Sequence, residues 1–453
     1  MAGDSEPFPL LTTAADRQLH SAAHDPNGPR RRRKSSILGS ELRVGDTGAP
    51  SLATGIAHHN GAAKEPAGPA TPSKRFSKRR KARSALRRAK NIAVKHTWVL
   101  PLAILLVFLA LYMVNPTESN PIHHFIFLSY RLPDSSTDEF PQYGKGLWDI
   151  AFVSFYTVVL SFTREFIMQE ILRPMARWHG LKSRGKQARY MEQMYTALYF
   201  GILGPTGMYV MSRTPVWYFN TRGMYENFPH KTHDAVFKFY YLFQAAYWAQ
   251  QAIVLLLGME KPRKDFKELV GHHIVSLALI GLSYRFHFTY MGLAVYITHD
   301  ISDFFLATSK TLNYLDHILT GPYYFTFMCV WIYLRHYLNL RILFSLFTEF
   351  KTVGPYELNW ETQQYKCTLS FVITLALLSA LQALNLFWLF FILRIAYRFA
   401  VHNVAKDDRS DAEESELEEM NGSAPAIANG DAKSYAAVAA NGATANGAAK
   451  KSR

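Results

Sequence analysis

Long hydrophobic runs separated by short polar stretches fill the middle of the chain, from about Thr97 to Val401. Several runs approach the ~20 residues that a helix needs to cross a bilayer. The pattern predicts an all-α polytopic membrane protein with about eight transmembrane helices. The expected helices are Trp98–Val114, Leu147–Ile167, Met191–Met211, Val236–Leu257, Leu269–Phe286, Thr289–Ser309, Tyr323–Phe347 and Leu369–Val401.

The polar ends differ from this middle in composition and charge. Residues 1–96 are rich in small and polar residues and hold 19 Lys and Arg against 7 Asp and Glu. Such a segment is typical of a disordered tail. Because a hydrophobic run follows directly, we expect this basic tail to contact anionic lipid headgroups in the cytosol and not a nucleic acid.

The charges of the loops predict the topology. The expected loops 168–190 and 258–268 are richer in Lys and Arg than 115–146 and 212–235. Positive loops tend to stay in the cytosol. An even number of spans then places both termini in the cytosol.

The last segment, 406–453, is first acidic and then of low complexity. Ser410 and Ser415 precede carboxylates, which suits an acid-directed kinase, although a solvated charge run has the same composition. The chain ends with Lys450 and Lys451 at positions −4 and −3, which resembles a dilysine signal for return to the endoplasmic reticulum. We therefore expect a multi-pass protein of the endoplasmic reticulum membrane.

Ionisable residues interrupt two of the hydrophobic runs. His272 and His273 are adjacent in one run, and Asp300 and Asp303 lie in the next. His272 and Asp300 are each 14 residues from Phe286, where the chain is expected to turn. With the same rise of ~1.5 Å per residue in both helices, the two groups reach a similar depth. Ionisable groups at membrane depth are costly and usually functional.

Two interpretations of these groups follow. An Asp could accept a proton from one imidazole nitrogen, which fixes the histidine tautomer and makes the other nitrogen more basic. Alternatively, the acids pair with buried cations, for which the candidates are Lys310, Arg335 and Arg341. His299 is either a second base or a hydrogen-bonding residue at the rim, and Tyr247 and Trp248 are candidates to line a substrate tunnel. A zinc ion held by two His and one Asp is a third alternative, but we expect no metal.

The segment Gly271–Leu315, which contains both His and both Asp, resembles the Lag motif of ceramide synthases, particularly the fungal forms. The wider TLC domain of that family would cover 185–405, leaving 97–184 for the first two helices and their loops. The resemblance implies a barrel of six helices around an acyl-chain tunnel. It also implies catalytic roles for His272, His273, Asp300 and Asp303. Asn313 is a further candidate substrate contact.

The activity implied is transfer of a fatty acyl group from acyl-CoA to the amine of a sphingoid base. Histidine chemistry agrees with it, because the protonated amine needs a base with a pKa near 7. His272 could form an acyl-imidazole, or a histidine could act only as a general base. No cofactor is expected besides acyl-CoA as co-substrate.

Other partners and functions stay open at this stage. A homodimer or heterodimer and a small single-span regulatory subunit, as some fungal relatives use, are candidate assemblies. A non-enzymatic TLC protein that senses, translocates or transports lipids is the alternative to an enzyme. Transporters often have internal repeats and broken helices, and here Gly204-Pro205 is expected to break the third span without a counterpart elsewhere.

Overall fold

The computed structural model describes residues 91, 95–133, 140–258 and 265–402. All of them belong to one of two compact units of the chain, Ser73–Arg453. Ser410, Ser415, Lys450 and Lys451 lie outside the described residues, as does most of the basic N-terminal tail.

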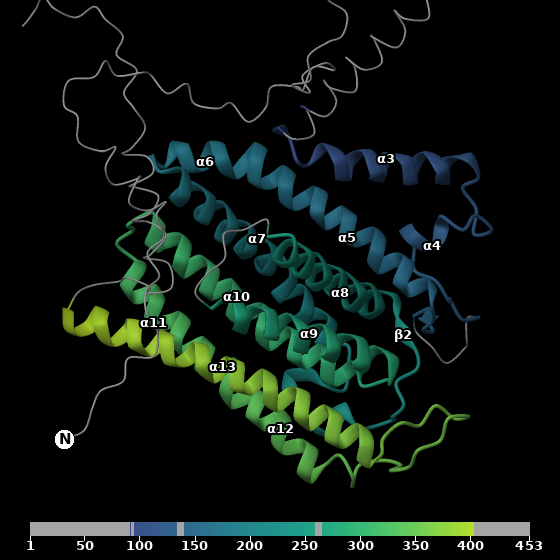
Figure 1. The fold of residues 1–453 in the computed structure, drawn as a ribbon. Helices are drawn as coiled ribbons and strands as arrows, with labels where there is room; N and C mark the ends of the chain where they lie inside the picture. The colour runs from purple at the N-terminus through teal and green to yellow at the C-terminus, as the bar shows by residue number, and fades with distance from the viewer. Residues whose placement is uncertain (1–90, 92–94, 134–139, 259–264, 403–453) are drawn as a thin grey trace, which may run out of the picture. The chain divides into compact units, whose positions relative to one another are not determined.

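Each of the eight hydrophobic segments forms helix (Figure 1). The helices are α3 (Val99–Val114), α4 (His123–Ile126), α5 (Trp148–Phe166), α6 (Arg173–Trp178), α7 (Arg184–Ser212), α8 (Ala235–Leu256), α9 (Phe266–Arg285), α10 (Thr289–Tyr314), α11 (Thr320–Trp331), α12 (Asn339–Thr348) and α13 (Thr368–His402). π-Helical segments join α5 to α6 (Ile167–Leu172) and α11 to α12 (Ile332–Leu338), and short 3-10 turns form at Trp217–Phe219 and Arg222–Met224.

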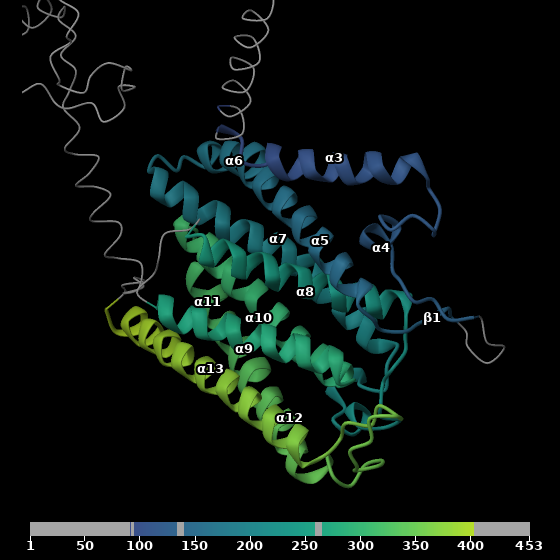
Figure 2. The same ribbon diagram turned by 45° about the vertical axis from the view of Figure 1, so that its right-hand side comes forward.

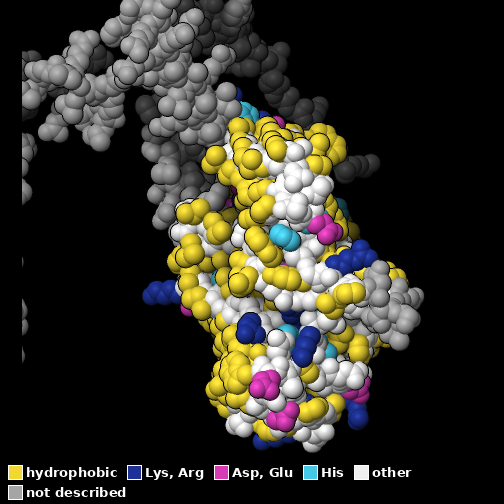
Figure 3. Space-filling view, turned by 90° about the vertical axis from the view of Figure 1, so that its right-hand side faces the viewer, with side chains coloured by type: hydrophobic (Ala, Val, Ile, Leu, Met, Phe, Trp, Pro, Cys, Tyr) yellow, Lys and Arg dark blue, Asp and Glu magenta, His cyan; other side chains and the backbone are white. Residues whose placement is uncertain are grey.

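Two of the described helices are long and apolar enough, by length and composition, to cross a membrane: Trp148–Trp178 and Thr368–Val401. α3 is apolar but shorter. α10 carries His299, Asp300 and Asp303, which lower its hydropathy, and the expected span 323–347 is divided between α11, a π-helical segment and α12. Hydrophobic side chains nevertheless cover much of the face in Figure 3, and most of its charged side chains lie in the middle and lower part of the view.

Three sequence expectations were wrong in detail. The second helix does not end at Ile167, because a π-helical segment and α6 continue it to Trp178. Pro205 does not break α7, which packs along α10 and continues to Ser212. The fold is mostly helical and not wholly so, because β1 (Gln142–Tyr143) pairs antiparallel with β2 (His233–Asp234) and joins two loops that the hydrophobic pattern left unstructured.

The helices pack as neighbours in an order that differs from the chain order. α3 packs on α5, α5 on α8, α8 on α9, and α9 on α13 (Figures 1 and 2). On the other side α13 contacts α12 and the π-helical segment before it, which in turn contact α10, and α10 packs against α7. α7 also contacts α8. A closed series, in which each helix contacts the next, is therefore formed by α7, α8, α9, α13, α12 and α10.

Buried charges hold together the end of the bundle that carries β1 and β2. The Lys238 ammonium pairs with Asp149 at 2.7 Å, and both side chains are buried. Tyr284 donates a hydrogen bond to the same carboxylate, and Lys145 donates to the carbonyl of His230 and to Nδ1 of His287. Because an unpaired charge is costly in such surroundings, these contacts fix how α5, α8 and α9 meet.

The first prediction concerns His287, which lies in the loop between α9 and α10. Burial, and next the Lys145 ammonium, lower its pKa from 6.5 to about 3. A base whose pKa is lowered on folding contributes stability that is complete above pH ~6.5 and is lost as the pH falls toward 3. The His287→Asn variant should therefore lose less of its apparent melting temperature between pH 6.5 and pH 4.5 than the wild type does.

Asn is the suitable replacement because His287 has a φ of 66°, which Asn tolerates better than most residues. The measurement is thermal unfolding in detergent across this pH range. Parallel curves for the two proteins would contradict the assigned role of His287.

Candidate functional site

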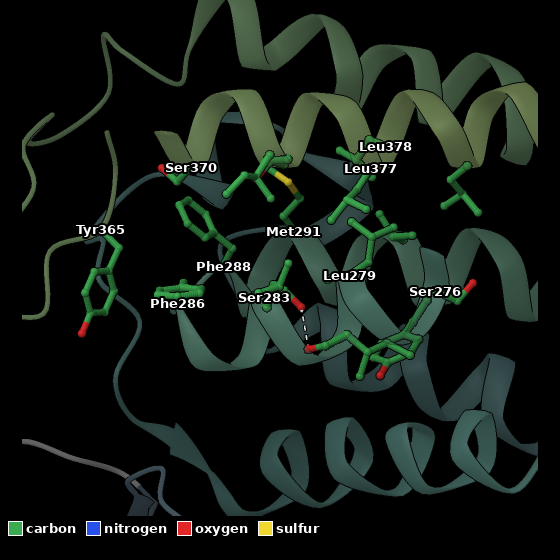
Figure 4. A pocket seen from close by; sticks show the side chains of 18 of the residues that line it. Ser276, Leu279, Ser283, Phe286, Phe288, Met291, Tyr365, Ser370, Leu377 and Leu378 are labelled. Carbon is green, nitrogen blue, oxygen red and sulfur yellow. Dashed lines mark hydrogen bonds between the residues drawn. The ribbon is translucent and has the colours of Figure 1, made fainter. Parts of the chain in front are cut away.

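A cavity of about 180 Å³ lies between α9, α10, α13 and the loop that precedes α13. Leu279, Leu377 and Leu378 are among its mostly apolar lining, and Phe286 and Tyr365 stand at one end (Figure 4). His272 and His299 also line it. The lining of α9 runs from His272 to Phe286, which corresponds to ~21 Å of helix. The cavity is therefore long and apolar, with two histidines at one end.

His272 is buried, with 6% of its surface exposed, and its ring lies between two tryptophans. The ring centroids of Trp248 and Trp388 are 5.5 and 5.2 Å from that of His272, both edge-on. The Trp388 indole N–H donates to Asp265. Nδ1 of His272 is buried and has no hydrogen-bond partner among the described residues. A buried polar atom without a partner is uncommon and needs an explanation.

His273 points in a different direction from its neighbour. The two imidazole planes are at 89°, as expected for adjacent residues on a helix. Nδ1 of His273 lies 2.9 Å from the carbonyl oxygen of Leu269, and the ring also contacts Trp248. His273 is not among the side chains that line the cavity, so its position suits support of the site.

Asp300 is fully buried and bonded to α8. Tyr240 donates a hydrogen bond to its Oδ2 at 2.9 Å, and Gln244 donates to the same oxygen. The Tyr199 hydroxyl donates to the Gln244 carbonyl oxygen, which extends the network to α7. Gly207 makes room for it, because a Cβ atom there would lie 2.4 Å from the Tyr240 hydroxyl.

Asp303 forms an ion pair with Arg335 at 2.5 Å. The expected hydrogen bond between an aspartate and an imidazole is therefore absent from the described contacts of both acids. The physical reason is that Arg335 is itself buried and needs a counter-charge. Arg335 was one of the three alternative partners that the sequence offered.

His299 lies inside the cavity wall and not at a rim, with 4% of its surface exposed. Its Nδ1 lies 2.8 Å from the Val295 carbonyl oxygen, and its Nε2 lies 3.3 Å from the amide nitrogen of Asn385. In contrast with His272, both of its ring nitrogens are engaged.

The other candidates separate into two places. Trp248 lines the cavity, while Tyr247 is buried behind it and stacks on Tyr199 with ring centroids 3.8 Å apart. Asn313 is exposed near the end of α10 and lines a different, smaller cavity with Lys310. Within the described residues, no three His, Cys, Asp or Glu side chains are grouped to hold a metal ion.

Comparisons with known proteins show the family of the chain. Residues 189–394 match the TLC domain family model. The "Sphingosine N-acyltransferase-like protein FUM17" of Gibberella moniliformis is 54% identical over 332 residues, 72% of this chain and 86% of that protein. "Sphingosine N-acyltransferase lac1" of Schizosaccharomyces pombe is 47% identical over 357 residues, 78% of this chain and 92% of that protein. "Ceramide synthase LAG1" of Saccharomyces cerevisiae is 44% identical over 417 residues, 90% and 98% of the two chains.

The chain belongs to the sphingosine N-acyltransferase, or ceramide synthase, family of TLC-domain proteins. The resemblance inferred from the Lag-like segment is thus confirmed. In this chain the segment supplies His272 and His299, which line the cavity, and Asp300 and Asp303, which belong to the surrounding polar network.

Sequence reasoning missed three polar residues of this family member's site, Gln244, Asn385 and Trp388. Gln244 and Asn385 are amides inside hydrophobic helices, and both are fully buried. A buried amide needs hydrogen-bond partners. An Asn or Gln within a hydrophobic run was therefore the signal that could have indicated these two residues. Trp388 carried no such signal, because tryptophan is common in membrane helices.

The second prediction tests the Arg335–Asp303 pair. Arg335→Met leaves the Asp303 carboxylate without its partner and should destabilise the protein by ~3–5 kcal/mol, as removal of one member of a buried pair does. Adding Asp303→Asn removes the remaining charge and should recover much of that loss. The measurement is thermal unfolding of the two single variants and the double variant. A double variant no more stable than Arg335→Met would contradict the pairing.

Proposed function

We propose that this chain is a ceramide synthase, which transfers a fatty acyl group from acyl-CoA to the amine of a sphingoid base. The product is dihydroceramide or phytoceramide. Relatives named sphingosine N-acyltransferase or ceramide synthase, identical at 44–54% of aligned positions, support the proposal. The observation that carries it is the unpartnered, buried imidazole of His272 at one end of a long apolar cavity.

The reaction proceeds in two steps, with His272 as nucleophile. A nitrogen of its imidazole attacks the thioester carbonyl carbon, the carbon–sulfur bond breaks, and CoA leaves as the thiol with the N–H proton of the ring. The neutral sphingoid amine then attacks the acyl-imidazole, the amide bond forms, and the imidazole leaves with one proton of the amine, which restores its N–H. Acyl-CoA is the co-substrate and no further cofactor takes part.

The shape of the cavity supports this assignment of the acyl chain. A saturated chain has no polar groups, so it gains free energy from burial among the apolar side chains of α9, α10 and α13. Its carbonyl carbon would lie beside His272 and its methyl end toward Phe286 and Tyr365. Trp248 and Trp388 flank the reacting ring and restrict the access of water to it.

In the membrane we propose eight spans, with the six helical segments of α7 to α13 forming a barrel around this cavity and α3 and α5 outside it. The closed series of contacts from α7 to α13 supports the barrel. Both termini would be cytosolic, in the endoplasmic reticulum membrane, with the His272 end of the cavity on the cytosolic side. The basic segment 172–190, which contains α6 and the start of α7, would then face the phosphates of CoA; of the second basic segment, 261–267, residues 261–264 lie outside the described residues. A homodimer or heterodimer and a single-span subunit remain predictions from the family resemblance.

The third prediction is that His272→Ala lowers ceramide formation by at least ~10³-fold, because loss of a catalytic nucleophile costs that much or more. The measurement is N-acylation of a labelled sphingoid base by purified protein, with exposed His317→Ala as a control that keeps wild-type activity. Incubating wild type with acyl-CoA alone should give an acylated His272 peptide in mass spectrometry. Full activity of His272→Ala would exclude the nucleophile, and a wild type that makes no ceramide would exclude the function.

The fourth prediction concerns the depth of the acyl chain. Ser276 lies one helical turn from His272, whereas Thr374 lies 14 residues, or ~21 Å, before the Trp388 that contacts His272. Thr374→Phe should therefore shift the preference toward shorter acyl-CoAs, while Ser276→Phe should lower the use of all lengths. The measurement is the relative kcat/KM across acyl-CoA lengths. An unchanged profile for Thr374→Phe would place the chain elsewhere.

A further inference from the structure

The contacts of Arg335 determine the orientation of a neighbouring amide. A guanidinium only donates hydrogen bonds. Arg335 donates from Nε to the Ser302 hydroxyl at 2.6 Å and from Nη2 to Asp303. Its Nη1 lies 3.2 Å from Oδ1 of Asn385. Since Arg335 has no acceptor, the Asn385 atom that faces it must be the carbonyl oxygen and not the amide nitrogen.

The orientation of Asn385 in turn determines the tautomer of His299. With its oxygen on Arg335, Asn385 presents its NH₂ group to Nε2 of His299 at 3.3 Å. Because the amide nitrogen is a donor, Nε2 must accept and carries no proton. The carbonyl of Val295 beside Nδ1 is an acceptor, so the ring proton lies on Nδ1. Both sides of the ring therefore require the same neutral tautomer.

We propose that Asn385 and Arg335 are positioning residues that hold His299 as a neutral, Nδ1-protonated imidazole. Asp303 then acts on the site through Arg335 and Asn385, without touching a histidine. The effect of this tautomer on catalysis rests on the proposed function. Acyl transfer to His272 places positive charge on that ring, and His299 lines the same cavity. A second cation there would oppose this step, since like charges repel strongly where water is scarce.

The charged and titratable groups around His299 favour the same state. Arg335 and His272, from neighbouring helices, act on it electrostatically, and the Arg335 charge disfavours a second cation nearby. On its own helix, Asp303 is neutralised by Arg335, and Asp300 is bonded to Tyr240 and Gln244. Neither acid thus compensates an imidazolium at this position.

The experiment is Asn385→Asp, which keeps the shape but replaces the donor with a carboxylate. That carboxylate accepts from Arg335 and also from an Nε2–H, so both ring nitrogens of His299 become donors and the imidazolium is favoured. We expect ceramide formation at pH 7 to fall by ~10-fold or more, with most of the loss reversed by pH 9 as the ring loses its proton; each unit of pH changes the neutral fraction up to tenfold. A purely structural defect would not recover with pH.

Gln382→Glu is the matched control. Gln382 lies one turn from Asn385 on α13, contacts His336, and is outside the cavity lining. It receives the same amide-to-carboxylate change beside a buried histidine and should keep the pH profile of the wild type. The proposal is overturned if Asn385→Asp keeps full activity or loses activity equally at all pH values. It is also overturned if the activity of Gln382→Glu falls at pH 7 and recovers at pH 9 to the same extent as that of Asn385→Asp.

A measurement on the wild type covers the case in which Asn385→Asp does not assemble. Nitrogen-15 NMR of ring-labelled histidine, with His299→Phe for assignment, should find His299 neutral and protonated at Nδ1 between pH 6 and 8. A proton on Nε2 would overturn the proposal. Because this readout requires no turnover, it stays informative even if the wild type were to make no ceramide, which would refute only the proposed function.

Discussion

The burial of one guanidinium constrains the whole region around the cavity. Arg335 is 2% exposed, and a buried cation is tolerated only where a counter-charge and further acceptors surround it. Its acceptors come from α10 and α13, while Arg335 itself lies in the π-helical segment between α11 and α12. π-Helical turns often occur at functional sites. Here the turn belongs to the segment that presents Arg335 to both other helices, so one side chain ties three elements together.

The opposite end of the bundle follows the same rule with different residues. Lys238 and Asp149 are both buried and pair with each other, and Tyr284 adds a hydrogen bond. Between these two satisfied polar centres the interior offers mainly apolar side chains. The long cavity between α9, α10 and α13 lies in that apolar region, so its position follows from where the fold has satisfied its charges.

His272 differs from most other buried polar groups near the cavity, and this difference bears on the chemistry of the site. Elsewhere the buried polar groups near the cavity are mostly bonded, whereas His272 contacts aromatic rings and leaves Nδ1 without a partner. An unsatisfied buried group costs free energy. Among the described residues, the fold maintains this cost on an imidazole that lines the apolar cavity, where a nucleophile or base is needed.

Much of this could be predicted from hydrophobic periodicity and from the rarity of charge within it. The runs located the helices, and equal distances from Phe286 brought His272 and Asp300 to one region. The partners could not be predicted, because the choice between Arg335 and a histidine for Asp303 depends on how helices distant in sequence are rotated about their axes. The comparison of His272 with His299 makes the point: the two are the same residue type in the same cavity. Asn385, 86 residues from His299 along the chain, engages Nε2 of the His299 ring, whereas no described residue bonds Nδ1 of His272.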